Sequence, residues 1–327
     1  GGRGRAGGEE KRLWLRRVSD IETDICARMG SAAPENEDCG PRAWANALTG
    51  QSAFGVNGAQ NAGGPMLPIY YINMANRPDR RAFMERQLAS MGLACIRIEA
   101  VTEADISQED ADRYCNSDRP TFLRRRELGC TLSHERAWQA MLDNGAPAAL
   151  VLEDDAEVSH LLPAFLDEAE AIDADLIRIE TTGAWVRVYP IASRGESGVA
   201  VRGFRSTPMG TAGYVIKAEA ARRLIGHRGL RERQTDLALY NPFEEPGRSL
   251  KRVLTDPALC RQLGAGADAG RSDIAHDVVP HAYARKHPVS HAVLRLQRYL
   301  KRGVRNLIDD LAQRGRLERR IIPYAQE

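Results

Sequence analysis

The chain has 327 residues, enough for one large domain or two ordinary ones and for a full hydrophobic core. Lysine and arginine number 46 against 44 aspartates and glutamates, so the net charge of +2 gives no reason to expect a nucleic-acid partner. The six cysteines lack paired short spacings, no run approaches the roughly 20 apolar residues that cross a bilayer, and no basic-then-apolar leader opens the chain, so we expect a cytoplasmic protein.

Residues 1–65 are rich in glycine, alanine, asparagine and charge, and they show little sustained periodicity. We expect a weakly ordered extension there. Met66 directly precedes a convincing strand, so the functional domain is expected to begin at that residue and to run to residue 284. A basic amphipathic helical segment is expected over 285–327.

Strand and helix patterns alternate from Met66 onward. Short apolar runs predict strands over Leu67–Ile72, Ala94–Ala100, Ala148–Leu152, Asp175–Ile179 and Gly213–Ile216. Periodic apolar stretches predict helices over Pro78–Met91, Leu128–Leu142, Leu161–Glu170 and Ala218–Ile225. Such alternation indicates an α/β fold with a mainly parallel mixed sheet flanked by helices.

The polar turn after the first strand leads into a helix start. Pro78 suits the first helical position, and Asp79 suits the first turn. A helix amino terminus beside arginines is a natural diphosphate site, so we expect Arg77 and Arg80 to contact an anion close to Asn73. Surface arginines are most often simply solvated, and this segment by itself also fits that interpretation.

A cluster of small and polar residues comes next and contains Glu127, Gly129, Cys130, Ser133 and His134. Ser133 and His134 invite a nucleophile interpretation, but adjacent residues on a helix point about 100 degrees apart and do not face one another, so we do not expect a serine hydrolase. Cys130 beside Gly129 is a candidate reactive thiol, although a lone cysteine is more often a small buried hydrophobe.

Three consecutive acids, Glu153, Asp154 and Asp155, follow the most apolar short run of the chain. Crevices at the carboxyl ends of parallel strands are where open α/β sheets bind ligands, and carboxylates there can hold Mg²⁺ or Mn²⁺ against a diphosphate. Mutual repulsion makes such a cluster unfavourable without a cation. The alternative is that two of the acids merely cap the following helix.

Two later features complete the candidate site. The small-residue run Gly210–Tyr214 enters a predicted strand, and a sugar or nucleotide could lie against it near Thr211; close packing of backbone against backbone explains the small residues equally well. Asp236 is the isolated carboxylate that we consider for proton abstraction, since a general base must be separate from metal-held acids.

Residues 289–320 predict a basic amphipathic helix, because apolar side chains recur at spacings of three and four while arginine and lysine occupy other positions. Such helices can lie on anionic membranes. The alternative is that the apolar stripe packs on the functional domain and the cations form a solvated face, since most amphipathic helices face a core.

The motifs described above, taken in their order along the chain, resemble those of glycosyltransferase family 25, the lipopolysaccharide and collagen-type galactosyltransferases. The resemblance covers about Met66–Asp236 and rests on Ile72 and Asn73 leading to Asp79, Arg80 and Arg81; on Glu127, Gly129, Cys130, Ser133 and His134; on Glu153, Asp154 and Asp155; and on Gly210, Thr211, Tyr214 and Ala221. Met74 stands where the family commonly has leucine, a harmless exchange. The family implies a GT-A-like nucleotide-sugar-binding fold and, usually, UDP-galactose as the donor.

The resemblance also implies roles for single residues. Asp155 is expected to bind Mn²⁺ or Mg²⁺, with Asp154 and the later His276 as further metal ligands. An inverting displacement needs a carboxylate to deprotonate the acceptor hydroxyl, and Asp236 is the first candidate and Glu127 the second. The residues expected to bind the nucleotide sugar are Asn73, Arg77, Asp79, Arg80, Ser133, His134, Glu153, Asp154 and Thr211.

The expected acceptor is a sugar on lipooligosaccharide or another glycan, reached at the inner face of the membrane with peripheral contact through residues 289–320. Two alternatives stay open. A metal-dependent phosphotransferase or nucleotidyltransferase could also use acids after a strand and arginines at a helix start, and it predicts phosphate or nucleotide transfer with no sugar joined to an acceptor. A catalytically silent glycan-binding relative predicts that Asp155→Ala changes no turnover.

Overall fold

The computed structural model describes residues 67–263, 282–313 and 317–326. The described strands are β1 Ile69–Asn73, β2 Ile96–Glu99, β3 Ala148–Glu153, β4 Ala156–Val158, β5 Leu176–Arg178, β6 Glu180–Thr181, β7 Trp185–Arg194, β8 Ala200–Phe204, β9 Gly213–Lys217, β10 Arg252–Asp256, β11 Cys260–Gln262 and β12 Glu318–Ile321. The described helices are α2 Pro78–Ser90, α3 Gln108–Tyr114, α4 Arg125–Asp143, α5 Leu162–Ala169, α6 Ala218–Leu224, α7 Arg228–Arg231, α8 Thr235–Tyr240, α9 Ala282–Lys286 and α10 Pro288–Gln313. The predicted extension over 1–65 lies outside these ranges.

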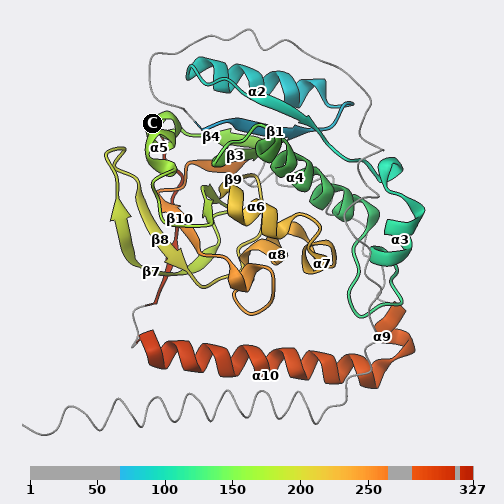
Figure 1. Ribbon diagram of the computed structural model, residues 1–327. Helices are drawn as coiled ribbons and strands as arrows, with labels where there is room; N and C mark the ends of the chain where they lie inside the picture. The colour runs from blue at the N-terminus through green and yellow to red at the C-terminus, as the bar shows by residue number, and fades with distance from the viewer. Residues whose placement is uncertain (1–66, 264–281, 314–316, 327) are drawn as a thin grey trace, which may run out of the picture. The chain divides into compact units, whose positions relative to one another are not determined.

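One sheet joins nine of the described strands in the order β12-β7-β8-β10-β5-β9-β3-β1-β2 (Figure 1). Strands β1, β2, β3, β5, β7 and β10 point one way, and β8, β9 and β12 run against them. Three of the eight neighbouring pairs in this sheet are parallel and five are antiparallel, so the sheet is mixed. A mixed sheet flanked by helices confirms the predicted α/β class. A smaller sheet joins β4, β11 and β6.

Helices cover both faces of the large sheet. Neighbouring residues of a strand point to opposite faces, so an apolar strand such as β1 supplies side chains to two cores. On one face, Ile69 and Tyr71 pack with residues of α2 and α5. On the other face, Tyr70 and Ile72 pack with residues of α4, α6, α7 and α8. Because β1 is buried on both faces, it is continuously apolar up to its last residue, Asn73.

Local signals set the ends of α4, the helix that carries much of the candidate site. Its start is capped where the Glu127 carboxylate accepts the backbone N–H of Arg124 at 2.8 Å. After its last turn, Gly145 adopts a φ of +65°, a conformation that glycine reaches without strain. The apolar strand β3 then begins at Ala148.

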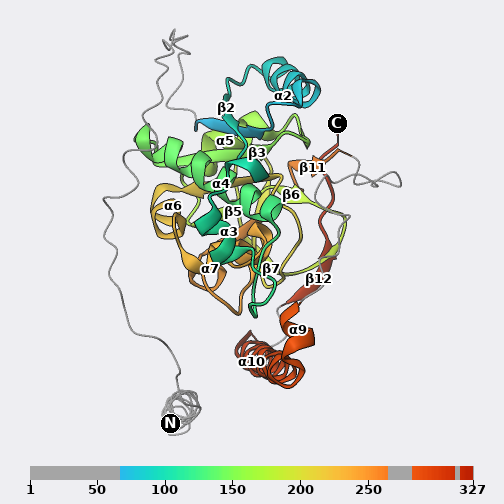
Figure 2. The same cartoon turned by 90° about the vertical axis from the view of Figure 1, so that its right-hand side faces the viewer.

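The end of the chain differs from the predicted helical segment over 285–327. Helix α10 ends at Gln313, and Glu318–Ile321 forms β12, which pairs antiparallel with β7 (Figure 2). The following Ile322 is buried in the core. A strand of this length is too short to show a period of its own, and it forms because β7 offers a sheet edge to pair with. Among the described helices, none combines the length and the apolar character that a membrane crossing needs.

Candidate active site

The predicted acidic cluster lies at one end of the sheet, where the carboxyl ends of β1 and β3 meet the start of β9. We call this end of the sheet the acidic edge. Strand β1 ends at Asn73 beside β3, with Ile72 in register with Glu153. Strand β9 runs antiparallel to β3, so the segment that enters it, Thr211 and Ala212, reaches the same edge. The Glu153 N–H donates to the Ala212 carbonyl at 2.9 Å. Residues from three distant parts of the sequence thus share one edge.

The Asp154 side chain is held by protein donors on both of its oxygens. Asn73 Nδ2 donates to Asp154 Oδ2 at 2.8 Å, and Arg80 Nη1 donates to Asp154 Oδ1 at 3.0 Å. Arg97 Nε in turn donates to Asn73 Oδ1 at 2.9 Å and fixes the orientation of the amide. Arg80 also reaches Asp155 Oδ2 at 3.5 Å. Asp154 is therefore a structural anchor that ties the acidic turn to β1 and α2.

Two other carboxylates at this edge are buried without full compensation. Asp155 Oδ1 and Glu180 Oε1 have no hydrogen-bond partner among the described residues. Burial raises the pKa of Asp155 to about 7, with a further contribution from the Glu153 carboxylate and partial relief from Arg80. Burial likewise raises the pKa of Glu180 to about 7 in spite of Arg178 beside it. Unpaired carboxylate oxygens are the donors that Mg²⁺ and Mn²⁺ prefer, so Asp155 and Glu180 each offer one oxygen of the kind that ligates such an ion.

A buried chain of hydrogen bonds orients His134 toward Glu153. Trp138 Nε1 donates to the Tyr214 hydroxyl at 2.8 Å, and that hydroxyl lies 2.9 Å from His134 Nδ1. If the hydroxyl proton is directed to Nδ1, the imidazole proton sits on Nε2, which lies 3.4 Å from Glu153 Oε1. Thr211 Oγ1 donates to the same oxygen at 2.5 Å. Burial acts to raise the pKa of Glu153, but His134 and Thr211 outweigh it and leave the pKa lowered.

Cys130 lies beside this chain. Its Sγ and the facing atoms of His134 and Glu153 all lie within 4.8 Å of one another. Burial raises the pKa of the Cys130 thiol well above its usual value, helped by the nearby Glu153 charge. A neutral thiol is a poor nucleophile, so the structure favours Cys130 as a packing group.

Three of the predicted nucleotide-sugar residues make local contacts instead. Ser133 Oγ accepts the Val101 N–H at 2.8 Å and donates to the Gly129 carbonyl at 2.7 Å, which ties α4 to the loop after β2. Arg77 and Asp79 form a 2.9 Å ion pair with each other, and the Asp79 side chain is 64% exposed. Neither contact brings these side chains to the acidic edge.

The pKa values of the two candidate general bases are shifted in opposite directions. Asp236 accepts two backbone N–H bonds, one from Gly210 at 2.9 Å, yet burial still raises its pKa. Glu127 Oε1 accepts from Arg124 Nη2 and from Gln234 Nε2, each at 2.7 Å. Burial alone would raise the pKa of Glu127, but these bonds outweigh it and leave the pKa lowered. A raised pKa suits a carboxylate that must take up a proton, so Asp236 is the better candidate.

A buried ion pair that was not predicted from the sequence also lies at this edge. Arg178, only 2% exposed, lies 3.2 Å from Glu180 Oε2, donates to the Met209 carbonyl at 2.6 Å and also contacts the Gly210 carbonyl. Its guanidinium lies 4.8 Å from the centre of the Tyr240 ring. The sequence did carry a signal for this pair, because Arg178 and Glu180 are opposite charges two residues apart at the end of the predicted strand Asp175–Ile179. The predicted ligand His276, and His281 near it, lie outside the described residues.

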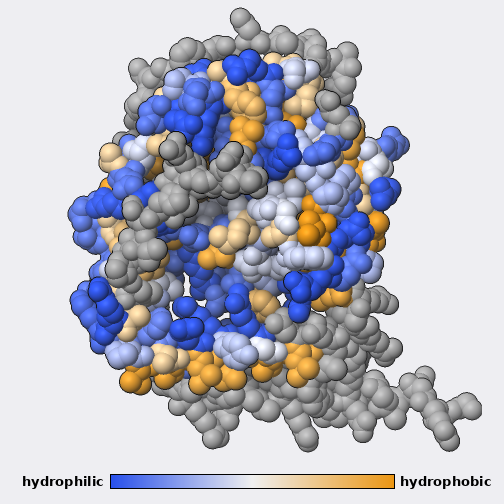
Figure 3. Space-filling view, turned by 180° about the vertical axis from the view of Figure 1, so that it is seen from behind, coloured by the Kyte–Doolittle hydropathy of each residue, from blue (hydrophilic) through white to orange (hydrophobic). Residues whose placement is uncertain are grey.

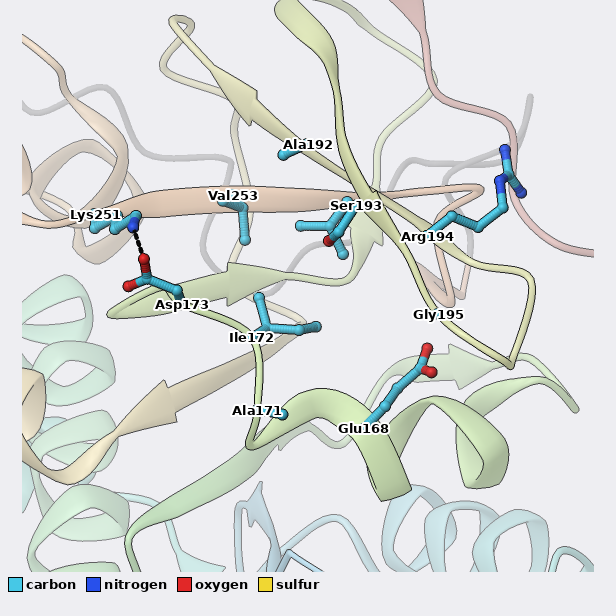
Figure 4. Close-up of a pocket in the computed structure, with 11 residues that line it drawn as sticks. Glu168, Ala171, Ile172, Asp173, Ala192, Ser193, Arg194, Gly195, Lys251 and Val253 are labelled. Atoms are coloured by element: carbon cyan, nitrogen blue, oxygen red, sulfur yellow. Dashed lines mark hydrogen bonds and ion pairs between the residues drawn. The ribbon is translucent and has the colours of Figure 1, made fainter.

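A separate cavity of about 460 Å³ lies between the end of α5 and strands β7 and β10 (Figure 4). Glu168, Ser193 and Arg194 line it, and the charges of Asp173 and Lys251 in its wall pair with each other. None of the predicted site residues lines this cavity, so we place the candidate active site at the acidic edge instead.

The part of the chain that contains the acidic edge is similar in sequence to known proteins. Residues 66–229 match the sequence profile of glycosyltransferase family 25 (LPS biosynthesis protein). The lacto-N-neotetraose biosynthesis glycosyltransferase LgtB of Neisseria gonorrhoeae is 28% identical over 212 residues, which cover 59% of this chain and 73% of that protein. Procollagen galactosyltransferase 1 of Danio rerio is 27% identical over 235 residues, 62% of this chain and 37% of that protein. A glycosyltransferase involved in glycosylating the major capsid of PBCV-1 aligns to 62% of this chain and 95% of its own at 12% identity, with a TM-score of 0.34.

Proposed function

Because the chain belongs to glycosyltransferase family 25, as the profile match over 66–229 shows, we propose that it transfers galactose from UDP-galactose to a glycan acceptor. The observation that carries the proposal is the acidic edge, where Asp155 and Glu180 each bury an oxygen without a partner. Galactose is supported by the similarity to procollagen galactosyltransferase 1, and a glycan acceptor by the similarity to LgtB.

The UDP-sugar donor would bind where the Arg80 guanidinium meets the carboxylates of Asp154 and Asp155. Asp155 supplies a buried oxygen for Mn²⁺ or Mg²⁺, and Asp154 holds that turn in place through Asn73 and Arg80. A divalent cation bound there supplies positive charge near the leaving diphosphate. Arg80 adds a fixed cation on the same side, and its guanidinium suits a phosphate oxygen.

The sugar would lie toward Glu153. The Glu153 carboxylate is kept ionised by its contacts with His134 and Thr211, so it can accept hydrogen bonds from sugar hydroxyls. Because His134 is fully buried and held by Tyr214, the position of this carboxylate is defined before the donor arrives.

We propose that the transfer is a single displacement that inverts the anomeric centre. The acceptor oxygen attacks the anomeric carbon, the bond from that carbon to the UDP oxygen breaks, and the acceptor proton passes to a carboxylate. Asp236 is the proposed base, since its raised pKa favours proton uptake. We place the acceptor sugar on a glycolipid or related glycan, with peripheral membrane contact through the region 289–320.

The deciding experiment measures UDP release by the purified chain with Mn²⁺ and a panel of UDP-sugars, with and without EDTA. We expect release selective for UDP-galactose, abolished by EDTA and lowered on the order of 100-fold or more by Asp155→Asn, because that change removes a charge that organises the leaving group. The matched control is Asp143→Asn at an exposed carboxylate that accepts only from the neighbouring Gln139 in the described contacts.

Three other outcomes would redirect the proposal. Selective release from a different UDP-sugar would keep the mechanism and replace the donor. Transfer of a phosphate or nucleotidyl group without a sugar would identify a phosphotransferase or nucleotidyltransferase. Binding of a glycan with no turnover in either the wild type or Asp155→Asn would identify a catalytically silent relative.

A further inference from the structure

Helix α10 turns its apolar side chains toward solvent. Six of them form one stripe along the helix, and their exposed fractions run from 46% to 76%. We call them the apolar stripe: Val289, Val293, Leu296, Leu300, Val304 and Leu307. Figure 3 shows apolar side chains in a row along the lower edge of the described surface, with hydrophilic side chains above them. An amphipathic helix in a soluble domain normally buries such a stripe.

The contacts that α10 makes with the domain come from its charged side. The Arg302 guanidinium lies 5.4 Å from the centre of the Phe243 ring, and Arg305 donates to the Phe243 carbonyl. Arg205 Nη2 donates to the Arg305 carbonyl at 3.2 Å. These contacts hold the helix by its cations while the apolar stripe stays exposed, the reverse of the core-facing arrangement.

The charged side chains along this part of the helix have one sign. From Pro288 to Ile308 the helix contains five arginines and lysines and no aspartate or glutamate. Those cations are Arg295, Arg298, Lys301, Arg302 and Arg305. At about 100° per residue, Lys301 lies at one side of the stripe and the four arginines lie on the opposite, polar face of the helix. A surface that is apolar beneath and anionic at its rim matches both features, and an anionic bilayer is such a surface.

We propose that the apolar stripe of α10, together with the exposed cations Arg295, Arg298 and Lys301 of the same helix, binds the surface of an anionic phospholipid bilayer. The stripe would enter the boundary between head groups and acyl chains, and these three long side chains would extend toward the phosphates. The biological reason for binding a bilayer rests on the proposed function, because a glycolipid acceptor is presented at a membrane. Vesicle binding is measured without sugar transfer, so the two proposals fail separately.

The test is flotation of the full chain with vesicles of phosphatidylcholine alone and of phosphatidylcholine containing phosphatidylglycerol. We expect flotation with the anionic vesicles, little with the neutral ones, and weaker binding as salt rises. The triple variant Arg295→Gln/Arg298→Gln/Lys301→Gln should lower the partition coefficient on the order of 100-fold, at about fivefold for each cation lost near an anionic surface. Leu296→Glu/Leu300→Glu should abolish flotation, because it places carboxylates within the stripe.

A matched control removes three exposed cations from other helices, Arg86→Gln/Arg222→Gln/Arg223→Gln, and should bind almost as well as the wild type. Circular dichroism and UDP release check that each variant is folded. Equal binding to neutral vesicles, no binding by the wild type, or flotation that survives Leu296→Glu/Leu300→Glu would overturn the proposal. So would a dimer in sedimentation velocity that Leu296→Glu/Leu300→Glu dissociates, since the stripe would then belong to a second copy.

Discussion

His134 shows how much of the site depends on one buried hydroxyl. The Tyr214 hydroxyl accepts from Trp138 and contacts His134 Nδ1, and all three side chains are fully buried. The Tyr214 hydroxyl thus links the Trp138 indole to the imidazole of His134. His134 Nε2 lies 3.4 Å from Glu153 Oε1 and makes no geometrically defined hydrogen bond within the described part of the chain.

Tyr214→Phe is therefore expected to destabilise the fold by about 1–3 kcal/mol, because it leaves the Trp138 N–H and His134 Nδ1 buried without a partner. Chemical denaturation measures the change in the free energy of unfolding. The control is Tyr71→Phe, since the hydroxyl of Tyr71 donates to Glu85, whose side chain is 43% exposed and can be hydrated instead. If the two variants lose equal stability, the buried chain does not have the role described.

At the level of elements, a close backbone approach at Gly129 helps to fix the position of α4, in addition to its buried face. A Cβ added at Gly129 would lie 2.5 Å from the Val101 carbonyl oxygen, which is closer than two such atoms can come. Ser133 one turn later bonds to the Val101 N–H. Gly129 and Ser133 therefore set the distance between α4 and the loop after β2. Because His134 follows Ser133 in the same helix, this distance also affects the position of the imidazole ring.

Gly129→Ala should destabilise the protein by about 1–3 kcal/mol, because either α4 or the Val101 carbonyl must move to admit the methyl group. The shift in midpoint of thermal unfolding reports the loss. Gly303→Ala is the matched control in α10, where the added Cβ meets no atom within 4 Å. That control should be neutral or more stable by up to about 1 kcal/mol, since alanine favours a helix over glycine. A Gly129→Ala protein as stable as this control would contradict the close approach.

At the scale of the whole molecule, the end of the chain is part of the core that supports the site. Strand β12 pairs with β7 at the edge of the large sheet. Thr181 Oγ1 donates to the Ile322 carbonyl at 2.7 Å, and the Ala258 N–H donates to the Pro323 carbonyl at 2.9 Å. Residues 318–323 thus join β7, β6 and the turn between β10 and β11, although α10 separates them in sequence from the rest of the domain.

Two adjacent isoleucines test this arrangement. Ile322 is 5% exposed and Ile321 is 42% exposed. Ile322→Ala should lower the free energy of unfolding by about 2–4 kcal/mol, because it leaves a cavity in the core, and Ile321→Ala should lower it by about 1 kcal/mol or less. Equilibrium denaturation of both variants makes the comparison. Equal losses would mean that Ile322 does not pack as described.

Local sequence patterns were enough to predict the α/β class, most of the central elements and the acidic cluster at the end of β3. These were readable because apolar runs and helical periods are local properties of the chain. The strands predicted near Ala148–Leu152 and Gly213–Ile216 appear as β3 and β9 with nearly the same bounds. The order of polar clusters after those strands was also enough to indicate glycosyltransferase family 25.

The different surroundings of the neighbouring acids depend on contacts with distant segments of the chain. Asp154 and Asp155 are neighbours with the same chemistry, yet Asn73, 81 residues away, binds Asp154, while Asp155 keeps an oxygen without a partner. The buried pair of Arg178 and Glu180, the return of the chain as β12 and the outward direction of the apolar stripe were likewise decided by contacts between distant segments. Burial and hydrogen-bond partners depend on which segments the fold brings together, and no local pattern carries that information.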